Sequence, residues 1–487
     1  MAGYCGPQIN QFYQILQRST GNFNSSNHVI YETLKMATTD ATSRLSATIT
    51  IFACTISGGL LTLPSVFAST SLLVSLLIVL FSAVTTFSSL LTLIVMGEMT
   101  NSWSYGQLVG SVFGRRSKLA INLLIGFFLV GVIGGSFIVV HDYTTQTFAT
   151  KGVASVATLL TALLVMLLSL PQKMGALSLG ASFSMFSFCF LVFTLVYYAT
   201  VEISSGALNN SNITIPWWAP ASDGPSVENE VEQRFASIGT AVPIILYAFG
   251  CQIQIFDIYD SVGKKRKRGG LRYFVPVLMG AVSLMVVLFS LVGVFGYFAF
   301  PDQKISGDVL KSLMTKGALG NVARGMLVLA CVFAAPLIVN PVLVCFTPVL
   351  QLMLGYEESP RKDEHAQTTF QKWRYLLIFM IVGSAASLAL SGIHFLVVVG
   401  ALGAFIASPL FFILPGGMLL YSMQGNQSNR NDNGVNLTLL DDGSMEEPSD
   451  RLELSKKEKC GAMFMGLWLV VIGVLTFVLS LWKFFKK

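Results

Sequence analysis

The sequence predicts an all-α, polytopic membrane protein, and two observations lead to this fold class. Of the 487 residues, 53% are hydrophobic and only 11% are charged, whereas soluble proteins carry about 25% charged residues. The second observation is the apolar segment 46–69, which is long enough to cross a bilayer as a helix but is interrupted by Ser57-Gly58-Gly59 and Pro64. A broken backbone at membrane depth persists only where protein buries it or where it lines a cavity, so the interruption indicates a solute site.

Apolar segments of membrane-spanning length recur along the chain, and eleven transmembrane helices are expected. The first ten form a core over 46–421, and the eleventh occupies 461–487 together with a short C-terminus. The polar stretches differ in composition: 1–45 is interpreted as a mostly disordered cytoplasmic tail and 422–460 as a disordered cytoplasmic linker. The eleven segments lie near 46–69, 72–96, 119–141, 153–170, 177–202, 234–262, 272–300, 320–350, 374–391, 393–421 and 461–482.

A second interrupted segment begins the second half of this core. Residues 234–262 read RFASIGTAVPIILYAFGCQIQIFDIYDSV, in which Pro243 and Gly250 interrupt the helix and the second half is polar. Because the first and the sixth segments both break at mid-membrane, the sequence predicts two five-helix repeats of inverted topology with a site between them. The repeats are expected at 46–202 and 234–421, with the loop 203–233 between them.

The distribution of Lys and Arg predicts that the N-terminus lies on the cytoplasmic side. With that orientation a cytoplasmic loop holds the run KKRKR at 264–268, whereas the long outer loop 203–233 holds neither Lys nor Arg. The same outer loop carries the glycosylation sequons at Asn209 and Asn212. The membrane itself is expected to be either the plasma membrane or an internal membrane of the vacuolar or lysosomal type.

Helix ends at the two interruptions predict a site for a zwitterion. Where the first helix breaks, its outer half begins with unpaired N–H groups at Gly59 and Leu60, which favour an anion. Where the sixth helix breaks, its outer half ends with carbonyl groups, which favour a cation. This arrangement suits the carboxylate and the ammonium of an α-amino acid without a charged side chain at mid-membrane. The residues expected to bind the substrate are Ser57, Gly58, Gly59, Leu60, Tyr247, Ala248, Phe249, Gly250, Cys251 and Gln252.

Four motifs resemble those of the amino acid/auxin permeases, and they occur in order at the expected segments. SGGLLTLP resembles the GxGILxLP signature of the first helix, and AFGCQIQIFDIY resembles FAFxCHxxxxxIYxE of the sixth. GYFAFPDQKISGDVL resembles GYxxFGxxVxxDIL at the end of the seventh, and Pro336 and Pro341 resemble paired prolines of the eighth. The resemblance implies a leucine-transporter-like fold and a secondary transporter that moves amino acids, or auxin, with protons or sodium.

Departures from the family pattern bear on the ion that drives transport. Sodium-coupled members often carry Asn where this sequence has Thr50 and Ala53, so proton coupling, or no obligatory ion, is favoured over sodium. Gln252 replaces the usual His, which removes one titrating group. Asp257 is then the candidate for proton coupling, because an acid within a membrane segment is a functional hypothesis by default. An interfacial ion pair with the neighbouring basic run is the alternative for Asp257.

The sequence therefore predicts a secondary active transporter of amino acids that works by alternating access, and not an enzyme. The four His residues form no cluster, and neither a metal nor a cofactor is expected. The net charge of +6 does not indicate nucleic acid. The expected partners are the amino acid, protons and the lipid bilayer. Two alternatives remain open, an amino-acid-sensing receptor with transporter architecture and a carrier of a related small amine or carboxylate such as auxin.

The predicted topology can be tested with inserted epitopes. An epitope at residue 220 should be reachable from the non-cytoplasmic side of intact membranes, whereas one at residue 440 should react only after permeabilisation, because the Lys and Arg distribution places the two residues on opposite sides. Labelling of both epitopes from the same side would contradict the eleven-helix topology.

Overall fold

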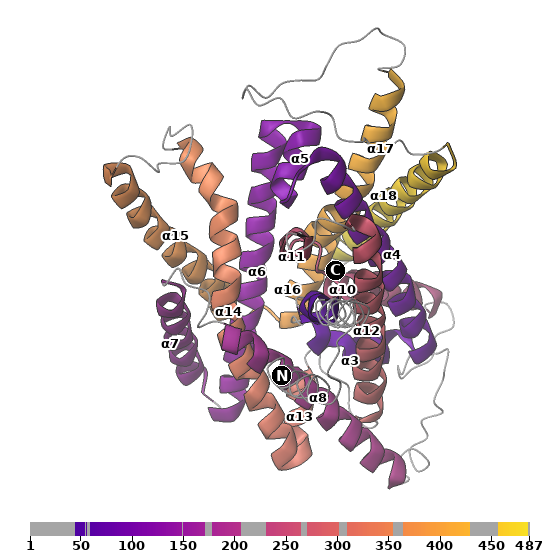
Figure 1. Cartoon of the computed structure of the whole chain (residues 1–487). Helices are drawn as coiled ribbons and strands as arrows, with labels where there is room; N and C mark the ends of the chain where they lie inside the picture. Colours follow the sequence, from indigo (N-terminus) through magenta and orange to yellow (C-terminus); the bar gives the residue numbers. More distant parts are fainter. Residues whose placement is uncertain are drawn as a thin grey trace, which may run out of the picture.

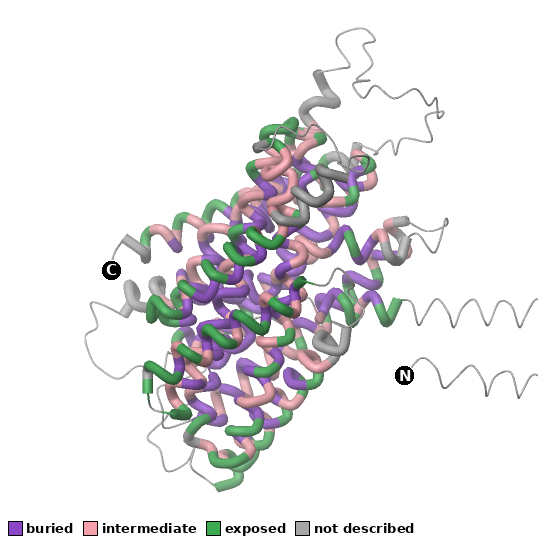
Figure 2. The backbone as a smooth tube through the Cα atoms, turned by 90° about the vertical axis from the view of Figure 1, so that its left-hand side faces the viewer, coloured by how far each residue is buried: buried purple, intermediate pink, exposed green. Residues whose placement is uncertain are grey.

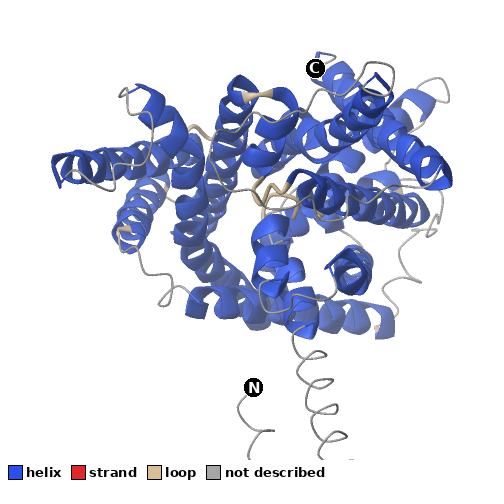
Figure 3. Cartoon of the chain, turned by 45° about the horizontal axis from the view of Figure 1, so that its top comes forward, coloured by secondary structure: helices blue, strands red, loops and turns tan. Residues whose placement is uncertain are grey.

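The computed structural model describes a chain that is helical without strands throughout the described residues (Figure 3). Nine helical stretches in this part of the chain are long and apolar enough to cross a membrane. The described residues are 44–53, 55, 59–148, 150–170, 178–205, 230–263, 270–300, 309–353, 364–428 and 456–485. The long helices are α4 (Leu72–Thr100), α6 (Arg115–Phe148), α7 (Lys151–Ser169), α8 (Ser178–Ser204), α12 (Gly270–Phe298), α14 (Gly317–Met353), α15 (Glu364–Leu390) and α18 (Lys456–Phe485), together with the continuous stretch formed by α16 (Phe395–Ala401), η3 (Leu402–Ala407), η4 (Pro409–Ile413) and α17 (Leu414–Ser428).

Shorter helices occupy the two segments that were expected to be interrupted. The described part of the first segment consists of helical residues over Arg44–Ala53 and of α3 (Gly59–Thr70). The sixth consists of α10 (Glu230–Ala248) and α11 (Ile255–Gly263), with six non-helical residues between them. The predicted break in the sixth helix therefore appears in the structure. The predicted break in the first helix falls on residues that lie outside the described part of the chain, so it stays a prediction together with the count of eleven transmembrane helices.

Several helices extend beyond the ends that were expected from hydropathy. Helix α6, which corresponds to the third expected segment, begins four residues before the expected 119 and continues to Phe148. Helical residues at the end of α17 and the start of α18 also reach into the stretch 422–460, which was expected to be disordered throughout. Ser57, Gly58, Asn209, Asn212 and the basic run 264–268 lie outside the described residues.

Two short elements were not predicted. Helix α5 (Tyr105–Phe113) follows α4, and its N-terminus is capped by Ser104, whose hydroxyl accepts the backbone N–H of Gln107 at 3.2 Å. Helix α13 (Val309–Leu313) and the 3₁₀ turn η2 (Met314–Lys316) precede α14. Figure 1 shows α5 and α13 at opposite ends of the helix bundle.

The interrupted helices pack with α4 and α12 as one group. Helix α3 contacts α10 and α12, and α12 also contacts α4. The contact between α3 and α12 requires glycine, because a Cβ atom at Gly293 would lie 2.5 Å from the ring of Phe67 and one at Gly296 would overlap Pro64. The small residues of α12 therefore allow the proline-containing helix α3 to approach its backbone closely.

A second group of helices is built around α6. This helix contacts α14 and α15 along much of its length and also contacts α7. Figure 1 shows α7, α14 and α15 on one side of the bundle and α4, α12 and α18 on the other. Buried residues line the inside of the bundle and exposed residues its outside (Figure 2). Many exposed side chains are large and apolar, such as Phe127 (61% exposed) and Leu160 (62%), which is the composition of a surface that faces lipid.

The stretch from α16 to α17, which corresponds to the tenth expected segment, contains a π-helical part that is stabilised by hydrogen bonds from other helices. A π-helix does not satisfy its carbonyl groups in the regular α-helical pattern, and such segments are frequent at functional sites. Here Ser89 of α4 donates its hydroxyl to the carbonyl of Phe411, and Tyr105 of α5 donates to the carbonyl of Leu410. Burial raises the pKa of the Tyr105 hydroxyl above its ordinary value, so this group remains protonated and continues to donate.

The Tyr105 hydrogen bond can be tested by removing the hydroxyl alone. Tyr105→Phe should lower the free energy of unfolding by about 1–2 kcal/mol, because the Leu410 carbonyl then lacks its donor. The measurement is thermal unfolding of the purified protein in detergent. Tyr421→Phe is the matched control, since Tyr421 is 57% exposed. Equal midpoint temperatures for the two variants would show that the hydrogen bond contributes little.

Candidate functional site

The first segment packs against the end of α10 at Gly59. This residue is buried, and the described part of α3 begins with it. A Cβ atom at Gly59 would lie 2.9 Å from Cδ1 of Tyr247 and 3.0 Å from Cα of Ala248, the last residue of α10. Only glycine allows this close approach of the first segment to the break in the sixth.

The non-helical segment after α10 is closely packed by an aromatic ring. The N–H of Gly250 donates to the carbonyl of Tyr247 at 3.0 Å, which partly satisfies one of the carbonyl groups expected to face the substrate. A Cβ atom at Gly250 would lie 2.7 Å from the ring of Phe411. The ring of Phe128 packs against both Tyr247 and Phe411, with its centroid 5.8 Å from that of Tyr247 and 5.5 Å from that of Phe411. The break is thus covered by aromatic side chains from α6 and η4.

Gln252 is the most unusual side chain of the break. It is completely buried, and neither Oε1 nor Nε2 has a hydrogen-bond partner among the described residues. A buried amide without partners is costly, by about 1–3 kcal/mol for each unsatisfied group. The carboxamide offers one acceptor and two donor hydrogens, so it suits a ligand that carries both an ammonium and a carboxylate.

The structure gives the other predicted site residues different surroundings. Leu60 and Cys251 are buried within the same core. The side chain of Phe249 does not lie over an open site, because its ring packs against Phe289 of α12 with centroids 4.8 Å apart. Phe249 can therefore reach a ligand only through its backbone carbonyl. Ser57 and Gly58 are part of the predicted site but lie outside the described residues.

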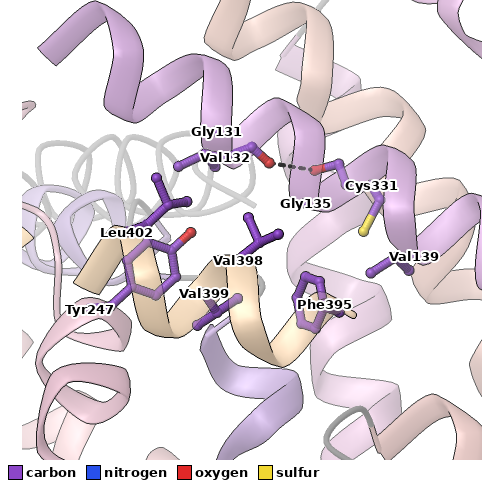
Figure 4. Close-up of a pocket in the computed structure, with 11 residues that line it drawn as sticks. Gly131, Val132, Gly135, Val139, Tyr247, Cys331, Phe395, Val398, Val399 and Leu402 are labelled. Atoms are coloured by element: carbon purple, nitrogen blue, oxygen red, sulfur yellow. Dashed lines mark hydrogen bonds between the residues drawn. The ribbon is translucent and has the colours of Figure 1, made fainter. Parts of the chain in front are cut away.

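A small cavity of about 20 Å³ lies beside Tyr247, on the side of α6, α14 and α16. In Figure 4 Tyr247 lies at one side of this cavity, and Phe395 and Cys331 lie at the other. None of the lining residues is charged. They are Gly131, Val132, Gly135, Ser136, Val139, Tyr247, Cys331, Phe395, Val398, Val399 and Leu402.

Of the lining residues, only Tyr247 was predicted as a site residue. The signal that could have indicated the others is the glycine-rich face of α6, where Gly131 and Gly135 lie one turn apart. Such glycines also arise from close helix packing, and a Cβ atom at Gly134 would indeed lie 2.7 Å from Leu388 of α15. Spacing alone could not separate the two roles.

The second half of the sixth segment, α11, is held by a polar and aromatic cluster. Tyr259 of α11 donates its hydroxyl to Glu98 at the end of α4, and its ring stacks on Trp103 with centroids 5.6 Å apart. Trp103 is positioned by Asn101, whose side-chain oxygen accepts the indole N–H at 3.0 Å. Asp257, the candidate for proton coupling, lies in the first turn of α11 and is exposed. Within the described residues no group of three His, Cys, Asp or Glu side chains could hold a metal ion.

Two relatives illustrate what the chain is similar to. It is 23% identical over 289 residues to solute carrier family 38 member 10 of Mus musculus, which covers 56% of this chain and 25% of that protein. It is 23% identical over 380 residues to vacuolar amino acid transporter 5 of Schizosaccharomyces pombe, which covers 74% of this chain and 80% of that protein. The chain thus spans about a quarter of the length of the mouse relative.

Among solved structures, the chain is similar to a manganese transporter of Eremococcus coleocola. The match has 13% sequence identity and a TM-score of 0.40, and it covers 90% of this chain and 93% of that one. The family model of transmembrane amino acid transporter proteins matches residues 40–436, which is most of the chain. This multi-pass membrane protein therefore belongs to the family of transmembrane amino acid transporter proteins.

Proposed function

We propose that the protein is a secondary active transporter that carries an amino acid across the membrane by alternating access. The observation that carries this proposal is the close packing of Gly59 against the end of α10, in a segment where Gln252 is buried and has no hydrogen-bond partner among the described residues. The substrate carboxylate binds to the N–H groups at the start of α3, and its ammonium binds to carbonyl groups at the end of α10. Gln252 completes the site with its carboxamide.

The physical reason for this assignment is the absence of charged side chains at the two breaks. The N-terminus of a helix carries partial positive charge and its C-terminus partial negative charge, so opposed helix ends can bind both charges of a zwitterion. Residues from 244 to 252 at the second break are all uncharged. An α-amino acid brings two opposite charges only a few bonds apart and so leaves no net charge buried. The name of the fission yeast relative, vacuolar amino acid transporter 5, is in keeping with this substrate.

Proton coupling is the second part of the proposal. Thr50 occupies a position where sodium-coupled family members often carry Asn, and its hydroxyl donates to the carbonyl of Ser46 within the same helix at 2.8 Å. Asp257 is exposed, so water can exchange protons with its carboxylate. We propose Asp257 as the group that couples proton movement to the position of α11.

The carboxylate site can be tested by filling the space at Gly59. Gly59→Leu should abolish uptake of labelled amino acid while protein level and membrane delivery are retained, because the new side chain occupies the approach to Tyr247 and Ala248. Ser57→Gly should be tolerated and should widen the range of substrates. Gly152→Leu is the matched control, since a side chain there would meet nothing within 4 Å. Uptake by Gly59→Leu at the rate of the unmodified protein would exclude this site.

Coupling to protons can be tested separately. Uptake should increase as the external pH falls from neutral to mildly acidic and should collapse with a protonophore. Asp257→Asn should abolish accumulation driven by pH but leave exchange of substrate intact, because the amide cannot release a proton. Glu98→Gln serves as comparison, since it removes the carboxylate that contacts α11 from α4, and its amide oxygen can still accept the hydrogen bond of Tyr259. Uptake that requires sodium and ignores pH would exclude proton coupling, and accumulation retained in Asp257→Asn would exclude only the role of Asp257.

A further inference from the structure

We propose that α4 and the π-helical stretch formed by η3 and η4 enclose a binding site for ordered water, made by the hydroxyl groups of Ser82, Thr86 and Ser408. The bound water joins the two helices by hydrogen bonds beside the break in the sixth segment. This inference concerns a contact between helices and does not depend on which solute the protein carries.

The three hydroxyl groups are buried without partners. Ser82 and Thr86 of α4 are completely buried, and Ser408, which lies between η3 and η4, is 1% exposed. None of their hydroxyl oxygens has a hydrogen-bond partner among the described residues. Buried polar groups in proteins are nearly always hydrogen-bonded, to protein atoms or to ordered water. Three such groups on two neighbouring helices therefore indicate a shared ligand.

Other buried hydroxyl groups of α4 are satisfied within the helix itself. Thr85 donates to the carbonyl of Phe81, and Thr92 donates to the carbonyl of Ser88, each at 2.8 Å. This bond to the preceding turn is a common arrangement for Ser and Thr inside a helix. Thr86 has the same side chain and does not make this bond, so its different behaviour follows from the face of α4 on which it lies.

Two contacts fix how α4 runs beside the stretch from η4 to α17. Ser89 of α4 donates its hydroxyl to the carbonyl of Phe411. Further along, the hydroxyl oxygen of Ser422 lies 3.6 Å from Sδ of Met96. Later residues of α4 thus lie beside later residues of the other stretch, which means that the two run in the same direction. Residues that precede Ser89 consequently lie beside residues that precede Phe411.

This register brings the three hydroxyl groups to one contact. Ser82, Thr86 and Ser89 are separated by four and three residues, so they share one face of α4. Ser408 precedes Phe411 by three residues, which is about one helical turn. Thr86 and Ser408 therefore lie at the same level, one turn before the bond between Ser89 and Phe411, and Ser82 lies one turn further.

Water suits this site better than a metal cation. A hydroxyl group has one hydrogen to donate and lone pairs that accept, and water can satisfy both because it donates and accepts as well. A cation would contact only the lone pairs and would leave the hydroxyl hydrogens without acceptors. The site is polar, and the residues next to Ser408 that are buried with it, Ala404 and Ala407, have small side chains. Buried waters typically make about three hydrogen bonds to groups of this kind.

The position of the site beside the sixth segment gives the water a role. Gly250, within the break, packs under the ring of Phe411, whose carbonyl is bonded to α4. A bridging water is nearly as favourable as a direct hydrogen bond. It can also change partners when the helices on its two sides shift, so it keeps the hydroxyl groups satisfied while the contact beside the break adjusts.

The sign of a stability change tests the water site. Thr86→Val keeps the shape of the side chain and removes the hydroxyl. A bound water then loses a partner, and the midpoint temperature of the full chain in detergent should fall by about 2 °C relative to the matched control Thr92→Val. Thr92 is equally buried, but its hydroxyl bonds to its own helix. A midpoint equal to or above that of the control would overturn the site, because removal of a hydroxyl without any partner stabilises the fold.

A double variant tests whether the water is shared. If one water bridges Thr86 and Ser408, the loss in Thr86→Val combined with Ser408→Ala should be smaller than the sum of the two single losses. Strictly additive losses would overturn the bridge. Replacement of sodium by choline should leave the midpoint of the unmodified protein unchanged. A decrease that Thr86→Val abolishes would assign the site to a cation and overturn the assignment to water.

Direct observation requires no variant. An experimental structure of the full chain, at a resolution that shows ordered waters, should contain a density peak within hydrogen-bonding distance of both Thr86 Oγ1 and Ser408 Oγ. Hydroxyl groups turned toward the carbonyls of their own helices, with no density between them, would overturn the proposal. Neither this measurement nor the thermal one uses transport as its readout, so a failure of the proposed function and a failure of the water site are distinguished.

Discussion

The structure depends on one constraint, which is that backbone N–H and C=O groups at membrane depth need partners. Unbroken helices satisfy it within themselves, but the sixth segment is interrupted between α10 and α11 and cannot. Other helices pack closely around this interruption, with Gly59 of α3 next to Tyr247 and Ala248. Glycines permit the approaches nearby, from those of α12 that admit α3 to Gly250 under the ring of Phe411.

The same constraint recurs in the stretch from α16 to α17. Its π-helical turns leave carbonyl groups that the regular pattern does not satisfy, and two hydroxyls from other helices supply the donors. Ser89 bonds to Phe411, whose ring covers the sixth-helix break, and Tyr105 bonds to the neighbouring Leu410. The stretch from α16 to α17 is therefore tied to α4 and α5 where the ring of Phe411 contacts the break in the sixth segment.

The two groups of helices differ in what they place around the break in the sixth segment. The group that includes α3 and α10 presents the end of α10, which is polar. The group around α6 and α14 presents side chains, and together with α16 it surrounds a small cavity whose lining residues carry no charge. Tyr247 is common to both, since it contacts Gly59 and lines the cavity.

The sequence by itself determined the membrane class, most helix positions and the interruption of the sixth segment, because hydropathy and the backbone effects of glycine and proline are local properties. Pro243 and the residues around Gly250 were sufficient to predict where the sixth segment breaks. Helix α5 was missed because nine residues with a few apolar positions give little periodic signal. Only the tertiary structure decided that Gln252 is buried without a partner among the described residues and that the ring of Phe249 packs against Phe289. It also formed the small cavity beside Tyr247, because residues such as Gly135, Cys331 and Phe395 are far apart in the chain and come together only when α6, α14 and α16 pack.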